Sequence, residues 1–190
     1  KQYVEERELT VMLVLDVSAS FLFGTVGRQK RGGAAELGAV LALSAITNND
    51  KVGLVSFSDV LENYVPPRKG RKHVLRIIRE LLASRPTNQG TDMLLALKMV
   101  NRALKRKAII FVISDFLIQQ EDIAEELMTL SRKHDVVSVV TQDPIEQAFV
   151  DIGLVTLEDA ETGELYTLDT SQPGWVGRYR QDAQASRESL

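Results

Sequence analysis

Side chains that carry oxygen atoms occur at three places in the chain, in patterns that suit a small divalent cation. Asp16, Ser18 and Ser20 alternate with other residues directly after an apolar run. In an extended loop, alternate residues point to the same side, so one carboxylate and two hydroxyls would face together. Thr91 lies just before a helical pattern, and Asp115 ends a second apolar run. Carboxylate and hydroxyl oxygens are hard ligands, which Mg²⁺ and similar ions prefer.

Each of these stretches also has an ordinary structural explanation. The pattern Asp-x-Ser-x-Ser is typical of a turn before a helix, in which side chains cap backbone N–H groups. Thr91 and Asp92 would by default form a helix N-cap. A joint site is favoured because Asp16 and Asp115 both follow apolar runs, and ligands of open α/β sheets bind beyond the carboxyl ends of the strands. All three stretches would then meet at one edge.

Apolar runs that alternate with helical patterns predict the scaffold. We expect strands at residues 11–15, 51–57, 108–114 and 135–141, and a short edge strand at 61–65, which two prolines follow. Apolar residues at helical spacing predict helices at residues 34–46, 73–82, 92–104 and 121–133. The first of these helices is nearly all apolar and should be well buried. The alternation indicates a Rossmann-like, doubly wound α/β fold, with a mostly parallel central sheet and helices on both faces.

The sequence changes character after Pro144. Two stretches rich in strand-forming residues, 154–157 and 165–168, flank a polar turn that ends in Gly163. This arrangement predicts a C-terminal β-hairpin. We expect six strands in the central sheet, with the hairpin added after the last helix-linked strand so that it extends one edge.

The composition excludes several classes of protein. The chain has 190 residues, of which 44% are hydrophobic and 26% charged, as in one globular domain. It contains no Cys, which excludes thiol catalysis, disulfides and thiolate metal sites. The net charge of -3 gives no reason to expect nucleic-acid binding. No apolar run approaches the ~20 residues that cross a bilayer, so we expect no membrane contact by this stretch.

The first residue is Lys1 rather than Met. We therefore expect residues 1–8 to be a linker from an upstream region, residues 9–170 to form the domain, and residues 171–190 to be a polar tail that could form a helix. We expect a cytoplasmic location, with any membrane anchor of the full-length protein in a region outside this chain.

The three stretches together resemble a known metal site. Asp16-x-Ser18-x-Ser20, the stretch 90–92 and the stretch 113–115 resemble the metal-ion-dependent adhesion site of von Willebrand factor A domains. The resemblance extends over nearly the whole chain in the family's order of elements. The stretches 7–10, 52–59 and 64–70 are similar to a bacterial branch, a domain of unknown function often encoded beside MoxR-type AAA+ ATPases.

The resemblance implies a role for each matching residue. Ser18 and Ser20 would bind the metal directly, and Thr91 would be the ligand from the third loop. Asp16 and Asp115 would bind directly or through water. The implied ion is Mg²⁺ or Mn²⁺. Hydroxyl ligands are neutral, so the ion would stay electrophilic, with one position open to a carboxylate from a partner protein.

The implied function is non-catalytic, divalent-metal-dependent protein binding, as a partner or co-chaperone of a MoxR-type AAA+ ATPase. A glycine-rich basic loop would overlook the metal, and its residues Arg28, Lys30 and Arg31 could select acidic partners. A solvated loop is the alternative explanation for these cations. Phe21 departs from the Met that many relatives carry there, which concerns packing rather than metal binding.

Two other functions stay open from the residues. Haloacid-dehalogenase-like phosphatases also place Asp after two strands, but they need a second Asp two residues after the nucleophile. Ser18 occupies that position and cannot act as an acid or base near neutral pH. A metal-free interaction scaffold is the remaining alternative. A serine hydrolase is set aside, because Ser18 and Ser20 lack the Gly-x-Ser-x-Gly elbow and no His is placed to act as a base.

Overall fold

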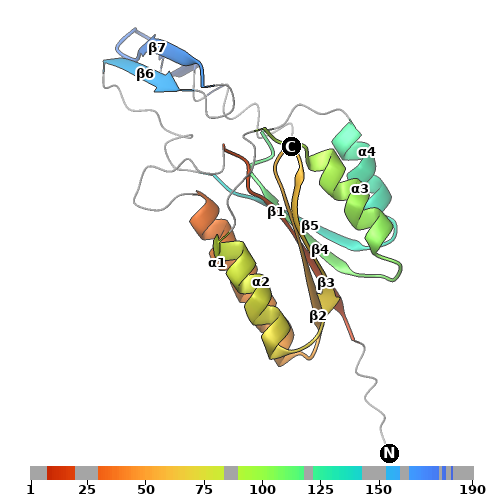
Figure 1. Cartoon of the computed structure of the whole chain (residues 1–190). Coiled ribbons are helices and arrows are strands. Elements are labelled where there is room, and N and C mark those ends of the chain that lie inside the picture. Colours follow the sequence, from red (N-terminus) through yellow and green to blue (C-terminus); the bar gives the residue numbers. More distant parts are fainter. Residues whose placement is uncertain are drawn as a thin grey trace, which may run out of the picture.

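A five-stranded sheet forms the centre of the molecule (Figure 1). The computed structural model describes residues 8–19, 30–83, 90–117, 122–142, 153–158, 163–175, 177–178 and 181. The strands of the sheet are β1 (Thr10–Asp16), β2 (Lys51–Phe57), β3 (Leu61–Arg68), β4 (Ile109–Ser114) and β5 (Asp135–Val140). Their order across the sheet is β3-β2-β1-β4-β5; β3 is antiparallel to β2 and the other neighbours are parallel. The carboxyl ends of β2, β1 and β4 therefore meet at one edge, with β1 in the middle.

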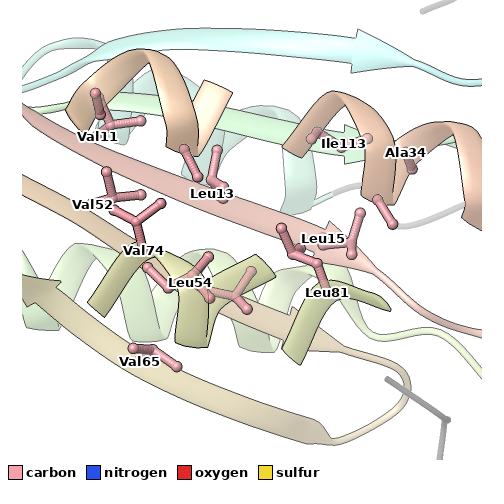
Figure 2. Packing of buried hydrophobic residues seen from close by; sticks show 14 of the residues in the cluster. Val11, Leu13, Leu15, Ala34, Val52, Leu54, Val65, Val74, Leu81 and Ile113 are labelled. Atoms are coloured by element: carbon pink, nitrogen blue, oxygen red, sulfur yellow. The ribbon is translucent and has the colours of Figure 1, made fainter. Parts of the chain in front are cut away.

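Two helices cover each face of the sheet. The helices α1 (Lys30–Thr47) and α2 (Arg71–Ala83) lie on one face, and α3 (Met93–Ala103) and α4 (Asp122–Ser131) lie on the other. Successive residues of a strand face opposite sides, so β1 supplies Leu13 and Leu15 to one core and Met12 and Val14 to the other. Figure 2 shows the first core, where Leu13 and Leu15 follow each other along β1 and Leu15 lies near Leu81 of α2.

The structure confirms the α/β fold class and the mostly parallel sheet with helices on both faces. It places β3 at the edge, as expected, but the strand continues through Pro66 and Pro67. An edge strand tolerates proline because one row of its N–H groups has no neighbouring strand to pair with.

The expectation that the first helix is well buried holds for only one of its sides. The residues of α1 that are fully buried against the sheet and α2 are small, among them Ala34, Ala42 and Gly38. Three larger residues of the helix pack partly buried against the same core: Leu37, Leu41 and Ile46. A Cβ at Gly38 would lie only 3.1 Å from Leu81 Cδ1, so glycine allows α1 and α2 to approach closely. The larger residues Val40 and Leu43 turn outward and are exposed.

The C-terminal hairpin is confirmed, but its expected place in the sheet is wrong. The strands β6 (Leu154–Glu158) and β7 (Leu165–Asp169) pair antiparallel as a separate two-stranded sheet, and the central sheet has five strands, not six. Figure 1 shows the hairpin apart from the central sheet. The hydrogen bonds that close it are internal: the backbone N and Oγ1 of Thr170 both donate to the Gly153 carbonyl.

Within the described residues, no helix combines the length and the apolar character that crossing a bilayer requires. In the tail, residues 175, 177, 178 and 181 are helical. The rest of the tail after residue 178, and the expected linker before Glu8, lie outside the described residues.

Gly53 in β2 occupies a position with no room for a side chain. A Cβ there would lie 3.0 Å from Met12 Cε, from Pro67 Cγ and from the Val65 carbonyl oxygen. Because the carbonyl belongs to the backbone of β3, relief requires the strands to move apart. We expect Gly53→Ala to lower the free energy of unfolding by about 1–3 kcal/mol, measured by urea denaturation.

Gly32 in α1 is the matched control, since a Cβ added there would meet no neighbouring atom within 4 Å. Gly32→Ala should leave stability unchanged or raise it by up to about 1 kcal/mol, because alanine favours a helix. Equal stability of the Gly53→Ala variant and the wild-type chain would contradict the close packing of β1, β2 and β3.

Candidate metal centre

The carboxylate of Asp16 lies at the middle of the sheet edge and is fully buried. Its Oδ1 accepts hydrogen bonds from Ser18 N at 3.0 Å and from Ser18 Oγ at 2.7 Å. Its Oδ2 accepts from Ser114 Oγ at 2.7 Å. This one side chain therefore connects the end of β1, the loop that follows it and the end of β4.

The loop after β1 is held by both neighbouring strands. Val17 N donates to the Phe57 carbonyl at 2.8 Å, which continues the pairing of β1 with β2. Asp16 then accepts from the backbone two residues ahead, an arrangement that Asp favours at turns. Ser18 is fully buried and its hydroxyl donates to the carboxylate, so the two side chains meet as expected, but through a turn rather than an extended loop.

Ser114 is a site residue to which the sequence patterns assign no role of its own. Besides donating to Asp16, its hydroxyl accepts from Phe116 N at 3.1 Å. The parallel register pairs Leu15 with Ile113, so Ser114 comes opposite Asp16. The sequence offers one signal, which is that Ser114 directly precedes the Asp that ends a strand. This signal can be interpreted only when the register between β1 and β4 is known.

Asp115 follows Ser114 and is nearly buried. Its Oδ1 accepts a hydrogen bond from Leu117 N at 3.2 Å. Between them, Phe116 has a φ of 56°, in the left-handed region that non-glycine residues seldom adopt. Its ring packs partly buried against the core under α3 and α4. The backbone turns at Phe116, which brings Leu117 N within hydrogen-bond distance of the Asp115 carboxylate.

Thr91 approaches the same edge from the other side of β1. The backbone N of the next residue, Asp92, donates to the Ser58 carbonyl at 2.7 Å. Asp92 is also the N-cap of α3, where its Oδ1 accepts from Leu95 N at 2.9 Å. The loop is thereby tied to the end of β2, next to β1. The predicted cap is at Asp92, which leaves Thr91, half-buried, as the hydroxyl candidate.

The structure brings together Asp16, Ser18 and Asp115, and it places the loop of Thr91 on the adjacent strand end. Ser20 lies outside the described residues, as does Arg28. Lys30 and Arg31 are the first residues of α1, and their side chains lie outside the described part. Their suggested contact with a partner stays a prediction.

Burial raises the pKa of the Asp16 carboxyl above its ordinary value, because desolvation penalises the charged form. The hydrogen bonds from Ser18 and Ser114 act in the opposite direction, and the negative charge of Asp115 raises the pKa further. Two carboxyl groups in a site that excludes water cost free energy when both are ionised. A cation between them would remove that cost.

The residues present fit a small divalent cation rather than a transition-metal site. Among the described residues, no group of three or more His, Cys, Asp or Glu gathers. A metal ion here would rely on the hydroxyls of Ser18 and Thr91 together with the carboxylates of Asp16 and Asp115. Oxygen-only ligand sets of this kind suit Mg²⁺ or Mn²⁺, which keep bound water when protein ligands are few.

Neither of the two histidines lies at this edge. His73 Nε2 is 2.9 Å from the Val52 carbonyl oxygen, near the start of β2. His134 directly precedes β5, so it also lies at the opposite end of the strands. Its ring is buried with no hydrogen-bond partner in the described part of the chain, and desolvation lowers its pKa.

The family model described as "Protein of unknown function DUF58" matches residues 1–189. An uncharacterized protein of Mycobacterium tuberculosis is 29% identical over 165 residues, which make up 86% of this chain and 52% of that protein. An uncharacterized protein of Mycobacterium avium is 31% identical over 101 residues, 52% of this chain and 59% of the relative. The chain thus spans about half the length of the curated relatives it matches.

Solved structures share the fold. The hypothetical protein BatB from Bacteroides thetaiotaomicron superposes with a TM-score of 0.63 at 20% identity, over 93% of this chain and 87% of that one. An aerotolerance-related membrane protein from Bacteroides fragilis gives the same TM-score at 18% identity, over 96% of each chain. At such identities the likeness concerns the fold alone.

The raised pKa of Asp16 has a direct consequence for stability without metal. The folded state holds this proton more tightly than the unfolded chain does, so its stabilising contribution is present at low pH and is lost as pH rises through the folded-state pKa. Asp16→Asn keeps the shape without the charge. We expect it to raise the melting temperature near neutral pH in the presence of chelator, measured by calorimetry.

Asp50 supplies the control, because it is a buried Asp that accepts a hydrogen bond from Leu9 N at 3.0 Å, before the start of β2. Asp50→Asn should not stabilise the chelated protein. A lower melting temperature for Asp16→Asn than for the wild-type chain would show that the Asp16 charge is not a burden on the metal-free fold.

Proposed function

We propose that this chain, which belongs to the DUF58 family, is a von Willebrand factor A-like module that binds a partner protein through a divalent cation. The observation that carries the proposal is the buried Asp16 carboxylate, hydrogen-bonded to Ser18 and Ser114 beside the second carboxylate of Asp115. Negative charge held at the centre of a sheet edge, next to hydroxyl groups, is the arrangement that a Mg²⁺ or Mn²⁺ ion would stabilise.

The ligand set also suggests what the ion would do. Two carboxylates balance the charge of a dication, and the hydroxyls of Ser18, Ser20 and Thr91 add no further charge. A coordination position filled by water would then accept a carboxylate from outside. Burying a partner's Asp or Glu there is favourable only while the metal pairs with it, because an unpaired buried charge is costly.

Several features support a binding role rather than catalysis. Both histidines of the chain lie at the other end of the strands, so no imidazole is available as a base at this edge. There is no Cys to act as a nucleophile. Ser18 occupies the position where a haloacid-dehalogenase-like phosphatase would need its acid or base. These observations favour protein binding over the phosphatase alternative.

We further propose that the partner is a MoxR-type AAA+ ATPase, for which this module would act as a co-chaperone or adaptor. The sequence resemblance of the stretches 52–59 and 64–70 supports this choice. The contact would take place in the cytoplasm, where such an ATPase finds ATP. The basic residues Arg28, Lys30 and Arg31 would steer an acidic surface of the partner towards the metal.

Metal binding is the first test. We expect isothermal calorimetry to detect one Mg²⁺ or Mn²⁺ site in the wild-type chain and none in Asp16→Ala, which removes one of the two balancing charges. Asp50→Asn, a buried Asp elsewhere in the fold, should bind the ion normally. At a free concentration of about a hundred times Kd, linkage should stabilise the wild-type chain by about 2.7 kcal/mol. Equal metal uptake by Asp16→Ala would refute the assignment and leave a metal-free scaffold.

Complex formation is the second test, measured by surface plasmon resonance against the cognate ATPase. Chelator should abolish binding, and Ser18→Ala combined with Ser20→Ala should do the same. Arg31→Glu should mainly slow association, with a smaller effect as salt rises, because steering is screened. Binding that is indifferent to chelator would place the contact elsewhere on the domain.

A further inference from the structure

The surface of α2 that faces away from the sheet carries cations interleaved with leucines. Its inner side is apolar and buried through Val74, Ile77 and Leu81, which recur at helical spacing. Leu75 and Leu82 do not belong to this buried row and are 50% and 58% exposed. The exposed residues that make up this surface, called here the α2 outer face, are Arg71, Lys72, Leu75, Arg76, Arg79 and Leu82.

The charge of the α2 outer face is opposite to that of the chain as a whole. The chain has a net charge of -3, yet α2 holds four cations and a single acidic residue, Glu80. Glu80 Oε1 lies 3.8 Å from Arg76 Nε and 3.7 Å from Arg79 Nη2. Its Oε2 accepts a hydrogen bond from Asn63 of β3. On the other side of the sheet, α4 contains three acidic residues and no basic one, and α3 contains two basic residues and no acidic one, so these two helices together carry a net negative charge. Positive charge is therefore concentrated on one layer of the molecule.

The neighbouring helix extends the same surface. Figure 1 shows α1 beside α2 as one outer layer, and no other element in the described part of the chain covers it. On α1, Val40 is 61% exposed and Leu43 is 48% exposed. The layer thus presents four protruding aliphatic side chains together with the cations of α2.

We propose that the α2 outer face lies on an anionic lipid surface. A shallow hollow on it is lined by Lys72, Leu75, Arg76 and Arg79, so three cations surround one aliphatic side chain. Lipid phosphates would pair with the cations, and the leucines would enter the boundary between headgroups and acyl chains. Exposed leucines among cations match a surface that offers both phosphates and acyl chains, whereas an acidic protein surface would pair only with the cations.

This contact is peripheral and differs from crossing the bilayer. The expectation from sequence that this stretch makes no membrane contact rests on the lack of an apolar run long enough to cross a bilayer, and a helix that lies on the surface needs no such run. The proposal is also independent of the metal site, because the α2 outer face lies along the side of the sheet whereas Asp16 lies at the ends of the strands.

The test is co-sedimentation of the whole chain with vesicles, in chelator so that the metal site makes no contribution. The two vesicle types are phosphatidylcholine mixed with phosphatidylglycerol, and phosphatidylcholine alone. We expect binding to the first type only, weakening as salt rises. Arg76→Glu with Arg79→Glu should lower the partition coefficient by about tenfold or more, because each reversal replaces attraction with repulsion.

Lys105→Glu with Arg106→Glu is the matched control, since it reverses two exposed cations in the turn between α3 and β4. It should retain binding. Arg76→Gln with Arg79→Gln provides a milder pair if the reversals disturb the fold beside Glu80. Leu75→Ser with Leu82→Ser should also weaken sedimentation although every cation is kept.

Three results would overturn the proposal. The wild-type chain could fail to sediment with the anionic vesicles, or the control pair could lose as much binding as the α2 pair. Binding to soluble poly-glutamate but not to the vesicles, unchanged by the two serine substitutions, would assign the face to an acidic protein instead.

Discussion

The organisation of this domain depends on one buried negative charge. Asp16 ends the central strand and has no contact with water, so its ionised form lacks the solvation that a surface carboxylate enjoys. Three hydrogen bonds, two from Ser18 and one from Ser114, offset part of that cost, while Asp115 adds to it. The loop after β1 and the end of β4 owe their relative positions to these bonds. In the function we propose, a divalent cation bound at this edge would balance the buried charge.

The sequence allows this site to be predicted in part, and the limits have physical causes. Asp16 and Ser18 are only two residues apart, so their contact is local and could be predicted, although the structure forms it in a turn rather than in an extended loop. The role of Ser114 could not be predicted in the same way, because it depends on the register between β1 and β4, where Leu15 pairs with Ile113. Two strands far apart in the chain can be recognised individually, but their register depends on packing across the whole sheet.

The two errors in the fold have the same origin. The first helix is rich in Ala and Leu, which predicts burial, but only one side of it packs on the core, and Val40 and Leu43 are left outside. The hairpin was predicted correctly as a pair of strands because turn and alternation are local signals. Nothing local states whether a third strand joins it, and the structure shows β6 and β7 paired only with each other. Local patterns predict elements well, and they predict the surfaces between elements less well.

The two surfaces to which we assign partners are compatible because they face different directions. Helices that cover a sheet run along its strands, so the outer face of α2 is parallel to the strand axes, whereas the Asp16 edge is at the ends of those axes. A lipid surface lying against α2 would therefore run past the metal edge without covering it. A partner protein docking at that edge would approach along the membrane rather than from above it. Peripheral lipid contact would thus confine the encounter to a plane and leave the coordination position open for the partner's carboxylate.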